Sequence, residues 1–244
     1  MRTLNASPSS RSEARPVMNK AVSSLDLSIY LVTDADMCHA AGRTVAQTVA
    51  EAVAGGVTCV QLRCKDAESL DFFNEVMEVA DAVADSVTLL INDRVDVFLA
   101  ARLAGANVAG VHVGQTDLPV ALVRKLIGPE AIIGLSASTP EELKEAEENP
   151  GRVDYIGIGV VRDTSTKTDA PEEHGIDGTG QIARSTHLPS VAIGGIKAPD
   201  MAPLAREGLD GAAVVSAICL APDAREAARE LADQWAEGLR SAGH

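Results

Sequence analysis

The sequence is poor in aromatic residues and in positive charge. Phe, Trp and Tyr make up 2% of the 244 residues, while hydrophobic residues as a whole make up 46%. A core of this composition must consist mainly of Val, Leu, Ile and Ala, as in parallel sheets covered by helices. Lys and Arg number 21 against 35 Asp and Glu, so the formal net charge is −14. We expect neither a nucleic acid nor a membrane as partner, and an anionic ligand would need a local cluster of cations.

Paired cysteines and long apolar runs are also lacking. The four cysteines are scattered without a CxxC pair, which predicts free thiols in a reducing compartment rather than disulfides or a zinc site. No apolar stretch reaches the roughly 18 residues that span a bilayer. The sequence therefore predicts a soluble, cytoplasmic protein, and it leaves the oligomeric state open.

The beginning of the chain differs from the rest. Residues 1–24 are rich in Ser and Arg and have no amphipathic apolar stripe, which favours a flexible leader over a transit peptide. We therefore expect residues 1–26 to be a leader and residues 27–244 to form one folded domain.

From residue 27 onward, short apolar runs alternate with segments of helical periodicity. Val45, Val49 and Val53 follow helical spacing after the first run, as do Leu231 and Trp235 after the last. The apolar runs that read as strands are 28–33, 58–63, 87–92, 108–113, 131–136, 154–159, 190–195 and 211–216. Eight strands with helical crossovers fit an α/β protein with a single (β/α)8 TIM barrel better than a doubly wound sheet.

In such a barrel the functional groups lie at the carboxyl ends of the strands. Asp93 and Asp117 follow consecutive strands there, and two unpaired carboxylates side by side would repel each other. A bound Mg²⁺ removes the repulsion, since this ion is typically held by one or two carboxylates, water and substrate phosphate. Capping of the following helices is the alternative role for both side chains.

Anion-binding groups also fall at this end of the predicted barrel. Gly194 and Gly195, together with Val215 and Ser216, follow the seventh and eighth strands, where barrels often bind phosphate, although paired glycines can also serve only a tight turn. Two cations at spacing i, i+2 on the second strand, and a third in the loop after the sixth, form a cluster that suits a pyrophosphate: Arg63, Lys65 and Lys167.

Groups for acid–base chemistry are scarce. His112 lies within an apolar strand and is interpreted as a satisfied core residue, and no nucleophile elbow, Walker loop or zinc spacing occurs. Two anion sites, a metal site and a long Thr-rich loop without a general base indicate group transfer rather than hydrolysis.

The strand ends resemble those of a known family. The blocks YLVTD, VQLRCKD, LLINDRVDV, GVHVGQTD, IGLSAST, TSTKTDAP, VAIGGI and AAVVSAI resemble, in order, those of thiamine-phosphate synthase (thiamine-phosphate pyrophosphorylase), over about residues 27–232. The resemblance implies a Mg²⁺-dependent transferase that joins hydroxymethylpyrimidine pyrophosphate to thiazole phosphate and releases pyrophosphate. Such a dissociative substitution needs charge neutralisation of the leaving group more than it needs a general base.

The resemblance also implies which residues hold each substrate. The pyrimidine pyrophosphate would be held by Gln61, Leu62, Arg63, Cys64, Lys65, Asn92, Ser136 and Lys167, with Arg63, Lys65, Ser136 and Lys167 as the catalytic set. The thiazole phosphate would be held by Thr164, Ser165, Thr166, Gly195, Val215 and Ser216. Asp93 and Asp117 would bind Mg²⁺.

The chain departs from the family at two places. The family commonly has Glu at the position of Cys64, whose side chain we expect to point away from Arg63 and to affect packing. Arg162 and Asp163 replace an apolar or aromatic residue followed by Pro or a small residue. Two rival functions are a thiazole tautomerase, which carries a catalytic His where this chain has Ser138, and a non-catalytic barrel that binds a phosphate ligand.

Overall fold

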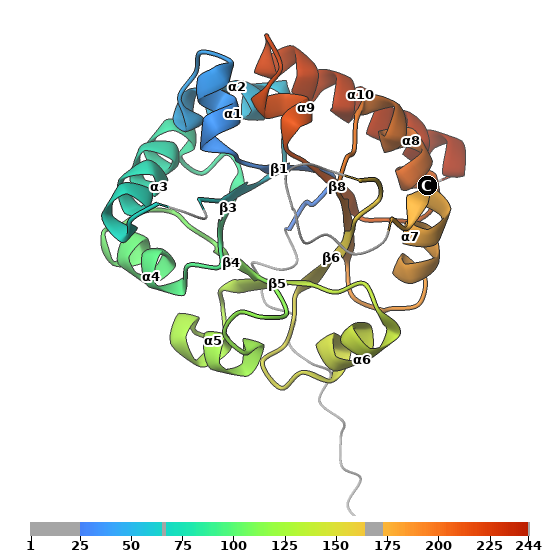
Figure 1. The fold of residues 1–244 in the computed structure, drawn as a ribbon, viewed down its shortest axis with the longest axis horizontal. Coiled ribbons are helices and arrows are strands. Elements are labelled where there is room, and N and C mark those ends of the chain that lie inside the picture. The colour runs from blue at the N-terminus through green and yellow to red at the C-terminus, as the bar shows by residue number, and fades with distance from the viewer. Residues whose placement is uncertain (1–24, 65–66, 164–172, 244) are drawn as a thin grey trace, which may run out of the picture.

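Eight parallel strands form a closed barrel with helices around it (Figure 1). The computed structural model describes residues 25–64, 67–163 and 173–243. The strands pair in chain order, and β8 closes onto β1. Their bounds are β1 Ile29–Val32, β2 Cys59–Leu62, β3 Thr88–Asn92, β4 Gly110–Val113, β5 Ile132–Ser136, β6 Tyr155–Gly159, β7 Ser190–Ile193 and β8 Gly211–Val214.

All eight strands lie within the runs predicted from the sequence, so the (β/α)8 barrel is confirmed and the doubly wound sheet is excluded. The largest differences at the mouth are at β7 and β8, which end two residues early. Gly194 has a φ of 105°, which takes the chain out of the extended conformation after β7. Val215 is the N-cap of a short helix after β8. Residues 1–24 of the predicted leader, which is expected to span residues 1–26, lie outside the described residues.

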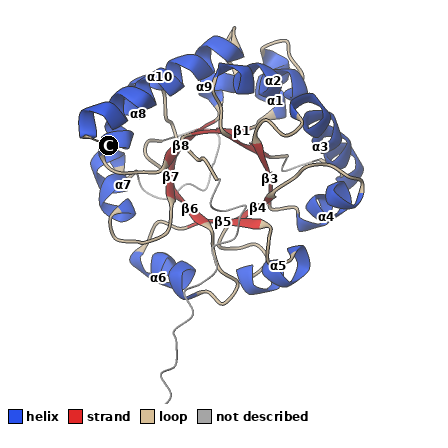
Figure 2. Cartoon of the chain, turned by 180° about the vertical axis from the view of Figure 1, so that it is seen from behind, coloured by secondary structure: helices blue, strands red, loops and turns tan. Residues whose placement is uncertain are grey.

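A ring of helices covers the outside of the barrel (Figure 2). Their bounds are α1 Ala35–Ala40, α2 Val45–Gly55, α3 Ser69–Val83, α4 Val95–Leu103, α5 Val120–Ile127, α6 Pro140–Glu148, α7 Gly175–Ala183, α8 Ala198–Arg206, α9 Ser216–Cys219 and α10 Ala224–Ala242. α2 begins with a capping box between Thr44 and Gln47. α10 buries Leu231 and Trp235, as its spacing predicts. In the described ranges, no helix is long and apolar enough to cross a membrane.

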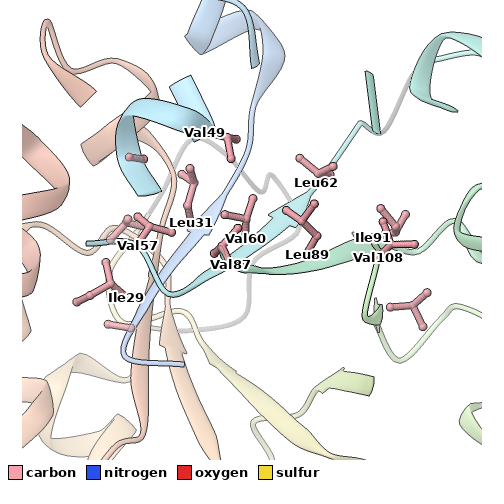
Figure 3. Packing of buried hydrophobic residues seen from close by; sticks show 14 of the residues in the cluster. Ile29, Leu31, Val49, Val57, Val60, Leu62, Val87, Leu89, Ile91 and Val108 are labelled. Atoms are coloured by element: carbon pink, nitrogen blue, oxygen red, sulfur yellow. The ribbon is translucent and has the colours of Figure 1, made fainter. Parts of the chain in front are cut away.

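Alternation along the strands separates two apolar layers. Leu31 and Val60 lie between the strands and the helices, close to Val49 of α2 (Figure 3). Tyr30 and Cys59, their neighbours along the chain, belong to a second cluster inside the barrel. Since successive side chains point to opposite faces of a strand, every second residue of each strand faces the interior and leads up to the mouth.

Candidate active site

Three predicted site residues continue the inward-facing rows of their strands. Two of them, Gln61 and Asn92, lie two positions after a residue of the inner cluster, and Ser136 lies four positions after one. Gln61 is buried, whereas Asn92 and Ser136 are partly exposed at the strand ends. The side-chain amide of Gln115 donates to the backbone oxygen of Ser136 at 2.7 Å, which ties the loop after β4 to the end of β5.

Asp93 and Asp117 are brought together at the mouth. Their carboxyl groups lie within hydrogen-bonding range, and Asn92 Nδ2 donates to Oδ2 of Asp93 at 2.6 Å. Burial and the charge of Asp117 raise the pKa of Asp93 to about 6, against smaller opposing effects of Asn92 and Arg63. The backbone of Asp93 has a φ of 58°, and its N–H donates to the backbone oxygen of His112 at 2.8 Å. The fold therefore holds two acidic groups where their charges repel.

Neither carboxylate caps a helix. The N-cap of α4 is Arg94, which makes no side-chain capping bond, and Asp117 Oδ2 accepts a bond from the backbone of Gly114 at 2.7 Å, within the loop that precedes α5. Arg94 instead pairs with Asp96 at 2.7 Å. The capping alternative for Asp93 and Asp117 is thus wrong at the helix ends that the structure describes.

Of the three cations in the predicted cluster, Arg63 is the one that lies among the described residues. Its charge acts on Asp93, and its backbone N–H donates to Oγ1 of Thr33 at 3.1 Å. β2 ends at Leu62, so the strand alternation expected to align Arg63 with the next cation stops one residue earlier. The other residues predicted here, Lys65, Thr164, Ser165, Thr166 and Lys167, lie outside the described residues.

Leu62 and Cys64 belong to the outer layer. Leu62 is fully buried in the cluster between strands and helices, and Cys64 packs against that cluster. The expected effect of Cys64 on packing is therefore confirmed. Contacts of these two residues with a ligand at the mouth would involve their main chain.

The loops after β7 and β8 are neighbours, because these strands pair with each other. A Cβ on Gly194 would stand 2.6 Å from Cβ of Val160, and one on Gly195 would stand 3.0 Å from Cβ of Arg162, so glycine is required for the close approach of the loop after β6. Ser216 begins the short extra helix α9 directly after β8. This is the part of a barrel that commonly receives phosphate groups.

Arg162 and Asp163, the departure from the family, anchor the start of the loop after β6. Arg162 pairs with the largely buried Asp200 of α8. The backbone N–H of Asp163 donates to Oε1 of Glu173 at 2.8 Å. The segment between Asp163 and Glu173 is therefore joined at its two ends by a hydrogen bond.

The sequence reading missed the two tyrosines inside the barrel. Tyr155 is fully buried, and its hydroxyl lies 2.8 Å from Nδ1 of His112 and 2.7 Å from the hydroxyl of Tyr30. Nε2 of His112 lies 3.1 Å from Oγ of Ser136. His112 is thus a satisfied core residue, as predicted, and it also contacts the site. Glycines within β5 and β6 were the available signal, because glycine inside a strand often marks a close approach.

Comparisons with known proteins show which family the chain resembles in sequence and fold. The family model described as thiamine monophosphate synthase matches residues 29–218. Thiamine-phosphate synthase of Albidiferax ferrireducens is 46% identical over 206 residues, covering 84% of this chain and 90% of that protein. The corresponding protein of Azorhizobium caulinodans is 47% identical over 207 residues, covering 84% and 93%. Thiamine phosphate pyrophosphorylase from Pyrococcus furiosus has a solved structure with a TM-score of 0.76 and 33% identity, covering 88% of this chain and 98% of that one. The chain therefore belongs to the thiamine-phosphate synthase family of transferases.

Proposed function

We propose that the protein joins hydroxymethylpyrimidine pyrophosphate to thiazole phosphate in a Mg²⁺-dependent dissociative substitution. The observation that carries this proposal is the pair of carboxyl groups on Asp93 and Asp117, held in contact beside Arg63 at the mouth of the barrel. A site that combines two acidic groups with a cation suits a metal-bound pyrophosphate better than it suits either a free anion or a neutral ligand.

The donor set fits Mg²⁺. Burial and the charge of Asp117 both raise the pKa of Asp93, so ionising both carboxyl groups is unfavourable unless a cation neutralises them. Among the described residues, no group of three or more His, Cys, Asp or Glu is placed to hold a metal. Two carboxylates are nevertheless enough for Mg²⁺, which takes its remaining ligands from water and substrate phosphates. When bound, the ion neutralises negative charge on the pyrophosphate.

The proposed reaction breaks one bond and forms another without a net proton transfer. The bond between the pyrimidine methylene carbon and the pyrophosphate oxygen breaks, and its electron pair leaves with the oxygen. The electron-rich pyrimidine stabilises the resulting cation until the lone pair of the thiazole nitrogen forms the new carbon–nitrogen bond. Arg63, Lys65 and Lys167 would balance the charge of the departing pyrophosphate, so the proposed step needs no acid–base dyad.

The second substrate would bind where the loops after β7 and β8 meet. Gly195, Val215 and Ser216 would offer backbone N–H groups and a hydroxyl to the thiazole phosphate, and the family resemblance adds Thr164, Ser165 and Thr166 to this set. The support is the short helix α9 after β8, an arrangement that barrels often use for phosphate.

Ser138 argues against the tautomerase. Its hydroxyl donates to the backbone oxygen of Gly159 at 3.0 Å, and its backbone N–H donates to Oε2 of Glu142 at 2.8 Å, so it fastens the end of β5 to β6 and to α6. A catalytic His in its place would have to break the hydroxyl contact. A non-catalytic barrel that binds only a phosphate ligand would not require the carboxylates of Asp93 and Asp117 to lie next to each other.

The direct test combines the purified protein, both substrates and Mg²⁺ and measures thiamine phosphate and pyrophosphate. We expect equal amounts of the two products and no turnover after chelation of the metal. Folded protein that gives no thiamine phosphate at any Mg²⁺ concentration would refute the proposal. Calorimetric titration of pyrophosphate with and without Mg²⁺ separates out the non-catalytic barrel, whose binding should not depend on the metal.

A further inference from the structure

A chain of hydrogen-bonded side chains crosses the interior of the barrel. Nε2 of Gln61 donates to the hydroxyl of Tyr30 at 2.8 Å, and that hydroxyl lies 2.7 Å from the hydroxyl of Tyr155. The Tyr155 hydroxyl lies 2.8 Å from Nδ1 of His112, whose Nε2 lies 3.1 Å from Oγ of Ser136. Five strands thus contribute one residue each to a connected path that ends at the mouth.

The surroundings of this path are apolar. The inner cluster consists otherwise of residues such as Leu90, Ile132, Val191 and Ala213, which is the usual filling of a barrel. A buried hydroxyl or imidazole is unfavourable there unless each polar atom is hydrogen-bonded. Phenylalanine would fill the same volume without that requirement. The hydroxyl groups of the two buried tyrosines therefore indicate a role beyond packing.

Two glycines make room for the path. A Cβ on Gly134, in β5, would stand 2.2 Å from Cζ of Tyr155 and 2.4 Å from Nδ1 of His112. A Cβ on Gly157, in β6, would stand 3.3 Å from Cε1 of His112. The first distance is too short for any real side-chain carbon, so β5 can pass the imidazole–phenol contact only because it has glycine at this position.

We propose that Tyr155 and His112 are positioning residues that fix the hydroxyl of Ser136 as a hydrogen-bond donor toward the pyrimidine pyrophosphate. This inference rests on the proposed function, because it assigns Ser136 to the pyrimidine half of the site. Neither Tyr155 nor His112 needs to touch a substrate for it.

The proposed direction gives each hydroxyl and the imidazole one accepted and one donated hydrogen bond. The amide nitrogen of Gln61 can only donate, so the Tyr30 oxygen accepts and its proton is available to Tyr155. Tyr155 then donates to Nδ1 of His112, which selects the neutral tautomer that carries its proton on Nε2. Nε2 donates to Oγ of Ser136. The serine, having accepted this bond, keeps its own proton for an acceptor outside the path.

Both tyrosines remain protonated in this arrangement. Burial raises the pKa of Tyr30 and of Tyr155 well above the ordinary value of 10.0. Each phenol therefore retains the proton that the path needs at neutral pH. A donor prepared in advance requires no reorganisation when the pyrophosphate arrives or departs, which is the general advantage of fixed dipoles in a site.

A double-mutant cycle tests whether Tyr155 acts through Ser136. We expect Ser136→Ala to lower kcat/KM for the pyrimidine pyrophosphate about 10- to 100-fold, and Tyr155→Phe about tenfold. The double variant should match Ser136→Ala within about twofold, because the phenol has no further effect once the serine hydroxyl is gone. The KM for thiazole phosphate should stay unchanged in all three. Independent, multiplying losses, or wild-type activity of either single variant, would overturn the proposal.

A control separates positioning from a general loss of packing. Thr179 is fully buried in α7, and its hydroxyl donates to the backbone oxygen of Gly175 at 2.6 Å. Thr179→Val removes one buried hydroxyl, as Tyr155→Phe does, and its effect on kcat/KM should multiply with that of Ser136→Ala. If Tyr155→Phe does not fold, His112→Leu takes its place in the cycle with the same expected outcomes.

A measurement without turnover distinguishes failure of this inference from failure of the proposed function. Nitrogen NMR of ¹⁵N-histidine protein reports which ring nitrogen carries the proton, and His112→Gln identifies the His112 signals. We expect the Nε2–H tautomer in the wild type and a mixture of tautomers in Tyr155→Phe. The Nδ1–H tautomer, or a mixture in the wild type, would overturn the proposal even in an active enzyme. If the wild type is inactive but has the Nε2–H tautomer, the proposed function is refuted, whereas the direction of the hydrogen bonds in the path is still supported.

Discussion

Replacing Asp93 by Asn should stabilise the metal-free protein while it abolishes most turnover. Asp93 has a pKa of about 6 instead of its ordinary 3.8, chiefly because of burial and the neighbouring Asp117. Such a change corresponds to about 3 kcal/mol, and solvent screening of the partly exposed side chain reduces it to about 1–2 kcal/mol. Asn suits the backbone as well, since it tolerates the positive φ of 58° at this position. The amide removes the unfavourable charge and retains an acceptor for Asn92.

The sign of the pH dependence follows from the raised pKa. The carboxyl group of Asp93 is most favourable when protonated, so its contribution to folding is fully present below pH 3.8 and is lost as the pH rises through about 6. The stability gained by Asp93→Asn should therefore be largest at pH 7.5 and should vanish near pH 4. Turnover with Mg²⁺ should fall about 100-fold or more, because one of two carboxylate ligands is gone.

Urea denaturation in EDTA at pH 7.5 and pH 4, beside a Mg²⁺-dependent assay, measures both effects. Asp96→Asn is the control, because Asp96 is exposed and its pKa is lowered by Arg94. This variant should lose less than about 1 kcal/mol at pH 7.5 and keep its activity. If Asp93→Asn instead destabilises the protein at pH 7.5, the carboxylate supports the fold and the argument for a metal ligand fails.

Two further substitutions test the packing of the barrel. Gly134→Ala should destabilise the protein by about 1–3 kcal/mol or more, because the new methyl group would clash with Tyr155. The control Gly178→Ala, in α7, should stabilise the protein by up to about 1 kcal/mol. Equal thermal midpoints for the two variants would show that β5 shifts to accommodate the methyl group. Arg124→Ala should lose about 3–5 kcal/mol in urea denaturation, since its guanidinium binds several backbone oxygens and a buried carboxylate. Arg229→Ala, which removes only the exposed ion pair with Glu226, should lower the free energy of unfolding by less than about 1 kcal/mol. Similar losses for the two variants would contradict the structural role of Arg124.

The sequence predicts the fold well because each strand is a short apolar run that carries its own signal. A strand buried on both faces needs no alternation to be recognised, and TLLIN of β3 shows this. The end of the same strand also locates Asn92 and Asp93 at the mouth, since parallel strands place their carboxyl ends on one side. Local sequence is sufficient for both conclusions.

Contacts between distant strands could not be predicted in this way. Asp93 and Asp117, by contrast, follow strands that are consecutive and paired, so the sequence predicts their proximity but not the positive φ of 58° at Asp93. The bond between Tyr30 and Tyr155 joins residues 125 positions apart. Their pairing requires the number of strands and the register of a closed barrel, because β1 and β6 are not neighbours in the sheet.

The scarcity of aromatic residues also supports a functional role for the hydrogen-bonded path inside the barrel. The chain has two tyrosines in all, and both lie inside the barrel with their hydroxyl groups in contact. The interior around them is made of small and branched residues, and Gly134 leaves the space that Tyr155 fills. Volume alone would be satisfied by Phe, with no polar atom to bury. A hydroxyl at each position, connected through His112 to Ser136, is explained if the interior of this barrel orients a group at its mouth.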